Sequence, residues 1–166
     1  QWENIGDAWV QGWEFSWRME LTDGFALNGD FTVTEGRYKY PREDWENTDY
    51  EERSEYISKF PLTSGHLGMQ YSVRDWQFTV DGTYQGAMYI DYYKNESIPE
   101  KIKKTNPYVL YDAKISKSFS NVTLFAKVEN LTDVVQPERH LDDAAFIYSP
   151  LFGRMYFGGI KLKLKH

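Results

Sequence analysis

Apolar and polar side chains alternate along the last stretch of the chain. From Tyr156 onward the even-numbered positions include Ile160 and Leu162, whereas lysines occupy the odd-numbered positions after Gly159. A period of two predicts a β-strand, because successive side chains of a strand point to opposite faces of its sheet. The run, from Arg154 to Lys165, is longer than the roughly five or six residues usual in soluble domains and suits the roughly 9–11 residues of a strand that crosses a bilayer. The pattern therefore predicts a membrane strand.

Six earlier stretches alternate in the same way, each with one apolar and one polar face. Aromatic rings are spread along the apolar faces, as with Trp13 and Phe15 in the first stretch and Trp76 and Phe78 in the fourth. Rings at strand ends are typical of membrane barrels. The seven predicted strands are Ala8–Leu21, Phe25–Thr34, Gly65–Val73, Trp76–Ile90, Tyr108–Phe119, Val122–Asn130 and Arg154–Lys165.

The connections between these strands alternate between short and long. The short ones are 22–24, 74–75 and 120–121, and the long ones are 35–64, 91–107 and 131–152. Transmembrane barrels show this asymmetry, with tight periplasmic turns and long outer loops. The fold class predicted is all-β, a transmembrane antiparallel up-and-down β-barrel. Because single-chain bacterial barrels have an even number of strands, we expect residues 1–166 to be the last seven strands of a larger barrel.

The two faces of the predicted sheet should meet different surroundings. We expect lipid to contact Trp13, Phe15, Phe78, Val80, Tyr84, Leu124, Ile160 and Leu162. The lumen should contain Glu14, Asp30, Asp81, Lys127 and Lys161, and the lumenal charges Asp112, Lys114, Lys127, Glu129, Lys161 and Lys163 should pair with each other or with a plug. The alternative is a soluble barrel such as a lipocalin, but so many rings turned inward would overpack a small interior.

Composition removes several other classes of protein. There is no cysteine, so neither a disulfide framework nor a thiolate metal site is available. The net charge is −6 and no basic patch is interleaved with aromatics, so nucleic-acid binding is not expected. The mean hydropathy of −0.66 is compatible with a barrel, whose lumen face and loops are polar. No signal peptide begins at Gln1, and we expect the N-terminus to be processed or missing.

Three short motifs occur in order along the chain. Val128–Asp133 reads V-E-N-L-T-D, Asn4–Ala8 is followed by Gly12–Glu14 in an N-x-G-x-A…G-x-E pattern, and Pro150–Gly159 reads P-L-F-G-R-M-Y-F-G-G. In these motifs the sequence resembles the TonB-dependent outer-membrane receptors. The final residue departs from the family, whose chains commonly end in Phe, Tyr or Trp, because the sequence here ends in His166.

The resemblance implies a barrel of about 22 strands with a plugged lumen. The plug domain and some fifteen strands would then be absent from this sequence, as would the box that TonB engages. It further implies active import of a scarce ligand, either a ferric siderophore, haem or a cobalamin such as vitamin B12, across the bacterial outer membrane. The implied partners are outer-membrane lipid, the remaining strands and plug, TonB, a small metal-chelate ligand and a surface lipoprotein. No cofactor is implied.

Residues in the long connections are the candidates for ligand contact. Rings with polar edges supply contact area at low entropic cost, and His140 could contact haem iron or a corrin. The candidates are Trp45, Tyr50, Tyr92, Tyr93, His140, Phe146 and Tyr148. The acidic residues Glu43, Asp44, Glu46, Asp49, Glu51 and Glu52 could bind Ca²⁺, but they lack the spaced glycine of a calcium loop, so a solvated loop is preferred and no metal site is predicted.

Two other functions compete with import. A passive porin or a small stand-alone barrel would share the strand pattern, and an upstream plug domain would exclude a porin. An outer-membrane phospholipase or protease needs a histidine paired with a serine or an aspartate. Neither His66 nor His140 has a recognisable partner in the sequence, so an enzyme is not expected.

Overall fold

The computed structural model describes residues 7–40, 55–57, 59–89, 104–136 and 148–164. The strands are β1 (Ala8–Thr22), β2 (Phe25–Tyr38), β3 (Thr63–Val73), β4 (Trp76–Gln85), β5 (Tyr108–Phe119), β6 (Val122–Glu129) and β7 (Met155–Leu162). Across those residues, no helix has the length and apolar character needed to span a membrane.

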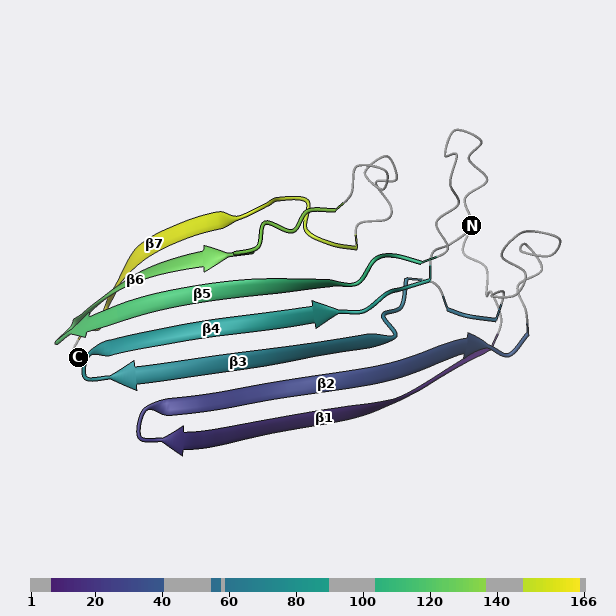
Figure 1. Ribbon diagram of the computed structural model, residues 1–166, viewed down its shortest axis with the longest axis horizontal. Coiled ribbons are helices and arrows are strands. Elements are labelled where there is room, and N and C mark those ends of the chain that lie inside the picture. Colours follow the sequence, from purple (N-terminus) through teal and green to yellow (C-terminus); the bar gives the residue numbers. More distant parts are fainter. Residues whose placement is uncertain (1–6, 41–54, 58, 90–103, 137–147, 165–166) are drawn as a thin grey trace. The chain divides into compact units, whose positions relative to one another are not determined.

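The seven strands form one sheet in which neighbours in sequence are neighbours in space, in the order β1 to β7. Successive strands run in alternating directions (Figure 1), and no crossover connection joins the described strands. Three of the connections are two-residue turns, in which Gly24, Arg74 and Ser120 have φ angles of 91°, 54° and 48°. Positive φ is common where a hairpin turn has to match the twist of its strands. The predicted meander with short turns at these three places is confirmed.

The chain divides into two compact units. The first unit comprises residues 1–14, 32–64 and 85–107. The second unit comprises residues 15–31, 65–84 and 108–166. Each unit is described by itself below.

In the second unit the strand register separates an apolar face from a polar face. Lys117, Leu124 and Ile160 share one row across β5, β6 and β7, on the apolar face. The next row contains Ser116, Phe125 and Gly159 and belongs to the polar face. A hollow of about 470 Å³ lies over the polar face. The polar face is therefore the hollowed side of this unit.

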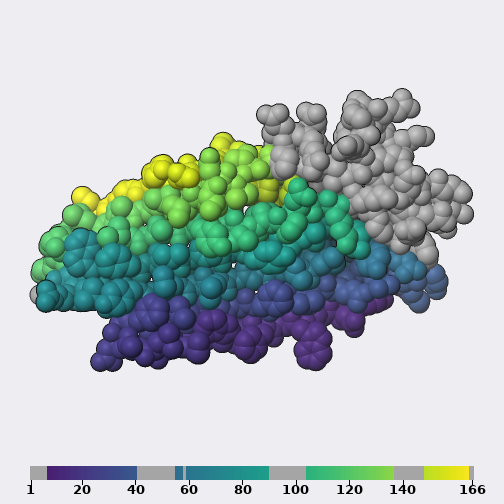
Figure 2. Space-filling model, viewed as in Figure 1, coloured from purple at the N-terminus to yellow at the C-terminus, as the bar shows by residue number. Residues whose placement is uncertain are grey.

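The large apolar side chains of the strands are not packed in a core. Trp13 is 85% exposed, Phe15 65%, Ile160 67% and Leu162 65%, and in Figure 2 side chains of β1, coloured purple, project from the surface. Among the described residues, the buried hydrophobic ones are Met88, Tyr89 and Tyr148. Met88 was predicted on the apolar face of the strand Trp76–Ile90, and it is buried beyond the end of β4. These rings do not pack inside a closed core in the part of the chain that the structure describes, as the prediction requires. Which face meets lipid stays a prediction.

Strand β4 is shorter than predicted, ending at Gln85 rather than Ile90. Beyond Gln85 the backbone donates from Gly86 to the carbonyl of Thr63, and Met88 forms an isolated bridge with Pro61. Proline has no N–H to donate, so it cannot continue a ladder of hydrogen bonds. The alternation from Gln85 to Tyr89 misled the prediction because it continues past the last residue with a full partner strand.

Two other strand ends also differ from prediction. Strand β7 ends at Leu162 rather than Lys165, because its partner β6 begins opposite it at Val122. Past that pair, Lys163 donates its backbone N–H to Asn121 in the turn. Strand β2 continues to Tyr38 rather than ending at Thr34, since the backbone of Thr34 donates to Leu62 and that of Tyr38 to Glu55. The end of each of these strands is therefore set by the segment of the chain that pairs with it.

A buried asparagine ends β6. Asn130 is 5% exposed and has a φ of 53°. Its side-chain Nδ2 donates to the carbonyls of Val134 (2.7 Å) and Phe152 (3.3 Å), and its Oδ1 accepts from the Val134 N–H (2.9 Å). Its own N–H donates to Asp112 Oδ1 at 2.9 Å. One side chain thus joins the segment that leaves β6 to the segment that enters β7.

Asp133 and Arg154 complete this connection, which we call the strand clasp (Asn130, Asp133, Gly153 and Arg154). Asp133 Oδ1 accepts the Arg154 N–H at 2.7 Å, and Arg154 Nε donates to the Leu131 carbonyl at 2.9 Å. A Cβ on Gly153 would lie 2.2 Å from Asp133 Oδ1, so a larger residue there would displace the carboxylate from its hydrogen bond with the Arg154 N–H. A hydrogen bond with Tyr156 is the main cause that raises the pKa of the Arg154 guanidinium, and the charge of Asp133 raises this pKa further. Arg154 therefore stays charged.

Replacing Asn130 in the complete protein should destabilise the fold. Asn130→Ala removes three side-chain hydrogen bonds and leaves alanine at positive φ, and the expected loss is roughly 2–4 kcal/mol. Asn130→Gly also removes the side-chain hydrogen bonds, but glycine adopts positive φ without strain. This variant should therefore lose less stability than Asn130→Ala. The measurement is urea unfolding in detergent, with the exposed turn residue Asn121→Ala as the control, expected within about 0.5 kcal/mol of the native protein. Equal stability of the two alanine variants would contradict the role of the clasp.

Candidate functional site

In the first unit, four side chains stack at the bases of two long connections. Arg37 Cζ lies 4.7 Å from the ring centroid of Tyr56, the Tyr56 and Tyr89 rings stack with centroids 4.5 Å apart, and Lys104 Nζ lies 4.4 Å from the Tyr89 centroid. We call these four residues the loop-base stack. Cations over the faces of stacked rings are attracted by the quadrupoles of the rings.

Backbone bridges place the loop-base stack at these positions. Arg37 bridges to Tyr56, and Tyr89 bridges to Lys104. The first bridge joins the chain on either side of residues 41–54, and the second does so for residues 90–103. The stack of Tyr56 on Tyr89 then joins the two bridges to each other, so the ends of both connections are held together.

Hydrogen bonds and ion pairs fix the surroundings of the stack. Arg37 pairs with Glu35 at 2.6 Å and with Glu55 at 3.5 Å. Thr105, which is 3% exposed, exchanges two hydrogen bonds with Met88: the Met88 N–H donates to Thr105 Oγ1, and the Thr105 N–H donates to the Met88 carbonyl, each at 3.0 Å. The guanidinium is therefore neutralised locally, whereas Lys104 is exposed.

On the polar face of the second unit, a histidine lies between two carboxylates. His66 Nε2 is 3.2 Å from Asp81 Oδ1, and His66 Nδ1 is 3.6 Å from Asp30 Oδ1. The three residues come from the neighbouring strands β3, β4 and β2. The sequence-based expectation that His66 has no partner was therefore wrong, because its partners are set by cross-strand register rather than by spacing along the chain.

The contacts of the His66 ring are with carboxylates. Among the described residues, both ring nitrogens of His66 face carboxylates and no serine or threonine hydroxyl hydrogen-bonds to the ring. A nucleophilic mechanism needs the hydroxyl within hydrogen-bond reach of its base. The same part of the chain contains no group of three or more His, Cys, Asp or Glu side chains arranged to hold a metal ion.

A second ionic cluster lies on the polar face around Lys127. Its Nζ pairs with Glu129 at 2.5 Å and with Asp112 at 3.8 Å, and the three side chains are each about one-third exposed. The prediction that the lumenal charges pair with each other is confirmed for these three. Lysine between two carboxylates suits the wall of a water-accessible interior.

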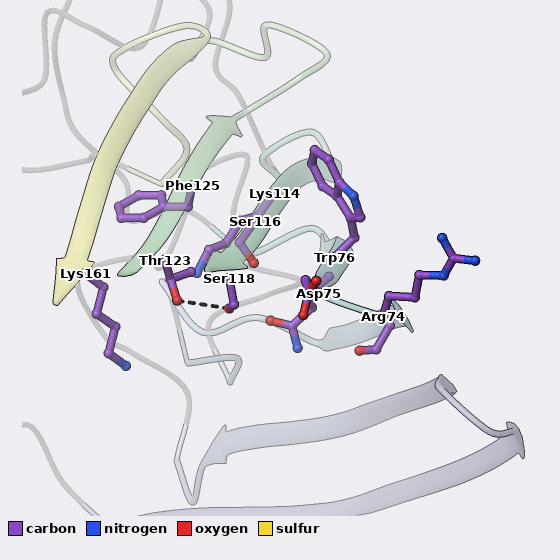
Figure 3. A pocket seen from close by; sticks show the side chains of 11 residues that line it. Arg74, Asp75, Trp76, Lys114, Ser116, Ser118, Thr123, Phe125 and Lys161 are labelled. Carbon is purple, nitrogen blue, oxygen red and sulfur yellow. Dashed lines mark hydrogen bonds between the residues drawn. The ribbon is translucent and has the colours of Figure 1, made fainter. Parts of the chain in front are cut away.

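The hollow over the polar face is lined by hydroxyls and lysines (Figure 3). Ser118 and Thr123 hydrogen-bond across β5 and β6 at 3.0 Å. The Phe125 ring covers Gly159, where a Cβ would lie 2.5 Å from the ring, and Lys114 Nζ is 5.2 Å from the ring centroid. The labelled side chains of β5, β6 and β7 that line the hollow are Lys114, Ser116, Ser118, Thr123, Phe125 and Lys161.

Most of the predicted ligand contacts lie outside the described residues. These are Trp45, Tyr50, Tyr92, Tyr93, His140 and Phe146, and the acidic set Glu43, Asp44, Glu46, Asp49, Glu51 and Glu52 lies outside as well. Their roles stay predictions. Of the candidates, Tyr148 is described.

Tyr148 is 8% exposed and is held through its backbone. Its N–H donates to Gln136 Oε1 at 3.0 Å, and its carbonyl accepts from the Tyr108 hydroxyl at 3.0 Å. Gln136, 2% exposed, also accepts from the Ser149 N–H and donates its own N–H to the Pro150 carbonyl. These bonds anchor the two ends of the connection between β6 and β7.

The loop-base stack was missed by the sequence analysis. Arg37, Tyr56 and Lys104 lie outside the predicted strands, Tyr89 was assigned to the predicted strand Trp76–Ile90, and none of the four belongs to a motif. The available signal was composition alone: each of the two long polar stretches has a tyrosine at one end and a basic residue at the other.

Comparisons with known proteins concern the fold of the chain. Residues 1–131 match the family model described as TonB dependent receptor-like, beta-barrel. No curated protein sequence matches the chain.

Among solved structures, the fold is similar to three transport proteins. The closed form of the ferric-catecholate import receptor Fiu from E. coli K12 gives a TM-score of 0.66 at 19% identity, over 92% of this chain and 20% of that one. The copper transporter OprC gives 0.66 at 18% identity, over 95% and 24%. A mutant of the ferric enterobactin receptor PfeA from Pseudomonas aeruginosa gives 0.59 at 21% identity, over 81% and 18%.

The chain thus spans about a fifth to a quarter of the length of these solved proteins. At such identities the structural likeness concerns the fold, whereas the family model covers most of the chain. The strand clasp joins the N-L-T-D segment that follows β6 to the G-R segment before β7. The chain therefore belongs to the TonB-dependent receptors, and its seven strands are part of their β-barrel.

Proposed function

We propose that this chain is the C-terminal part of the barrel wall of an outer-membrane receptor that imports a scarce metal-chelate ligand with energy supplied through TonB. The family match over residues 1–131 carries the proposal. The exposed apolar face and the hollowed polar face support it, because they suit a wall between lipid and a plugged lumen. A plug domain, the remaining strands and TonB are the partners that this function requires.

The ligand class that we propose is a ferric siderophore. Two of the similar structures carry titles that name ferric-catecholate or ferric enterobactin receptors, and a third is titled a copper transporter. The long segments next to the loop-base stack contain Trp45, Tyr50, Tyr92 and Tyr93, whose rings suit a large ligand with aromatic or polar edges. Haem and cobalamin are the other ligands to be tested.

Transport is a better account of the polar face than catalysis. The paired charges around His66 and Lys127 are satisfied within the wall, as in a water-accessible interior. The proposed receptor is accordingly not an enzyme. A passive porin stays the second candidate, favoured only if the complete gene lacks a plug domain.

Import should be measured with the complete receptor in a strain that lacks its own ferric-siderophore receptors. Growth under iron limitation should be restored by a ferric siderophore and should be abolished by deleting TonB. Uptake that continues without TonB would contradict the proposal and favour a porin. Growth on haem or cobalamin alone would correct the ligand class and leave the TonB-dependent mechanism standing.

Removing a ring from the loop-base stack should weaken ligand capture. Tyr89→Ala separates Tyr56 from Lys104, so binding would then have to pay the entropy of ordering both loop bases. The half-saturating ligand concentration for uptake should rise about tenfold at an unchanged receptor level. The control is Tyr40→Ala, a tyrosine that is 67% exposed and outside the stack. Equal uptake by the two variants would remove the stack from the account of ligand capture.

The same proposal predicts that residues 1–166 alone do not form a barrel. Strands β1 and β7 each have a strand neighbour on one side within the chain. In hydrocarbon each unsatisfied peptide group costs several kcal/mol, so both edges need further strands. The fragment expressed alone should give no heat-modifiable monomer on a semi-native gel. A stable closed monomer would contradict the proposed receptor and would show that residues 1–166 form a small stand-alone barrel.

A further inference from the structure

One lysine lies on the apolar face of the second unit. In the register of β5 and β6, Lys117 is opposite Leu124, which is opposite Ile160 on β7. Leu124 is 43% exposed and Ile160 67% exposed. The charge of Lys117 therefore interrupts a face whose neighbouring rows are apolar, and neither the fold nor the proposed import explains it.

The ammonium of Lys117 is directed toward the short turns. Its Nζ lies 4.7 Å from the ring centroid of Trp76 and 4.9 Å from that of Phe119. Trp76 is the first residue of β4 and Phe119 the last of β5, so both rings lie beside two-residue turns. The Ser118 N–H donates to the Asp75 carbonyl at 2.9 Å and fixes the end of β5 against the other turn. The lysine stem thus extends along apolar surface while its head reaches the end of the strand.

The rings beside Lys117 continue as an aromatic belt over neighbouring strands. Trp76 stacks with Phe78 at 6.2 Å, Phe78 with Tyr71 at 6.3 Å, and Tyr71 meets the edge of Phe25 at 6.2 Å. Rings in such a belt lie at the level of the lipid headgroups in membrane barrels. The belt therefore sets the depth of Lys117 at the headgroup layer on the short-turn side.

In the part of the chain that the structure describes, no carboxylate forms an ion pair with Lys117. Among the described residues, the ion pairs are made by Arg18, Arg37, Lys39, His66 and Lys127, and none involves Lys117. Within the described residues its ammonium contacts two ring faces, which leave N–H donors of the ammonium free to bind an anion. At the headgroup layer of the apolar face, the anion that the surroundings supply is the phosphate of a lipid.

We propose that Lys117, between Trp76 and Phe119, binds the phosphate of an anionic glycerophospholipid in the leaflet on the short-turn side. The rings would contact the glycerol and upper acyl chain, and the ammonium would donate to a phosphate oxygen. This inference rests on the proposed outer-membrane location of the chain. It assigns Lys117 a role in anchoring the barrel wall and none in ligand import.

The first test is native mass spectrometry of the complete, delipidated receptor titrated with phosphatidylglycerol. Lys117→Gln should weaken binding of the first lipid about tenfold, since a charge-assisted hydrogen bond is lost, and Lys117→Arg should retain binding. The matched control is Lys161→Gln, a lysine on the polar face opposite Thr123, which should bind as the native receptor does. Unchanged lipid binding by Lys117→Gln would overturn the proposal.

The second test uses the unaltered receptor, so it does not depend on the folding of a variant. In vesicles containing phosphatidylglycerol, an amine-reactive reagent should modify Lys117 several-fold more slowly than in phosphatidylcholine vesicles, whereas Lys161 should react equally in both. Equal modification of Lys117 in the two lipids would contradict the site. Protection by inorganic phosphate in detergent, equal to that by the lipid, would also overturn the assignment to a lipid.

Uptake measurements separate this inference from the proposed function. Lys117→Gln should import at the native rate while losing the lipid. A receptor that binds phosphatidylglycerol through Lys117 but imports nothing would refute the proposed import and leave the lipid site standing.

Discussion

Hydrocarbon offers no hydrogen-bonding partner to a peptide group, so each backbone N–H and C=O within a bilayer has to be bonded inside the protein. The meander from β1 to β7 meets this constraint for all the strands between its two edges, because each strand has a partner on both sides. The alternation of side chains follows from the same sheet. One face can be apolar toward lipid, while the other collects paired charges such as those around Lys127.

Irregular backbone occurs where the ladders end, and polar side chains satisfy it there. Asn130 bonds the segments on both sides of the β6–β7 connection, and Gln136 does the same for the backbone at Tyr148 and Ser149. In the first unit the loop-base stack joins the ends of two long connections through rings and cations. The long segments that carry the candidate ligand contacts are thus anchored at their bases, which in the proposed receptor would lower the entropic cost of binding a ligand.

The strands could be predicted because each face of the sheet has different surroundings, which leaves a period of two in the sequence. The ends of β4 and β7 could not, since Gln85 and Leu162 are the last residues with a full partner strand and the alternation continues past both. Contacts between side chains on different strands could not be predicted from the sequence either. The pairing of His66 with Asp81 depends on register, and the loop-base stack joins residues that are distant in sequence and that no motif connects. The N-L-T-D motif marked the family, but its hydrogen bonds appear only when β6 and β7 are placed side by side.

The central claim is that the apolar face of this wall meets lipid and the polar face meets water. Spin labels placed one at a time at Phe78, Thr79, Val80 and Thr83 of the complete receptor in lipid vesicles test it directly, by relaxation with oxygen and with a water-soluble nickel chelate. Labels at Phe78 and Val80 should be relaxed by oxygen and shielded from nickel, and labels at Thr79 and Thr83 should show the opposite. Equal accessibility at all four positions, or the reverse alternation, would contradict the account.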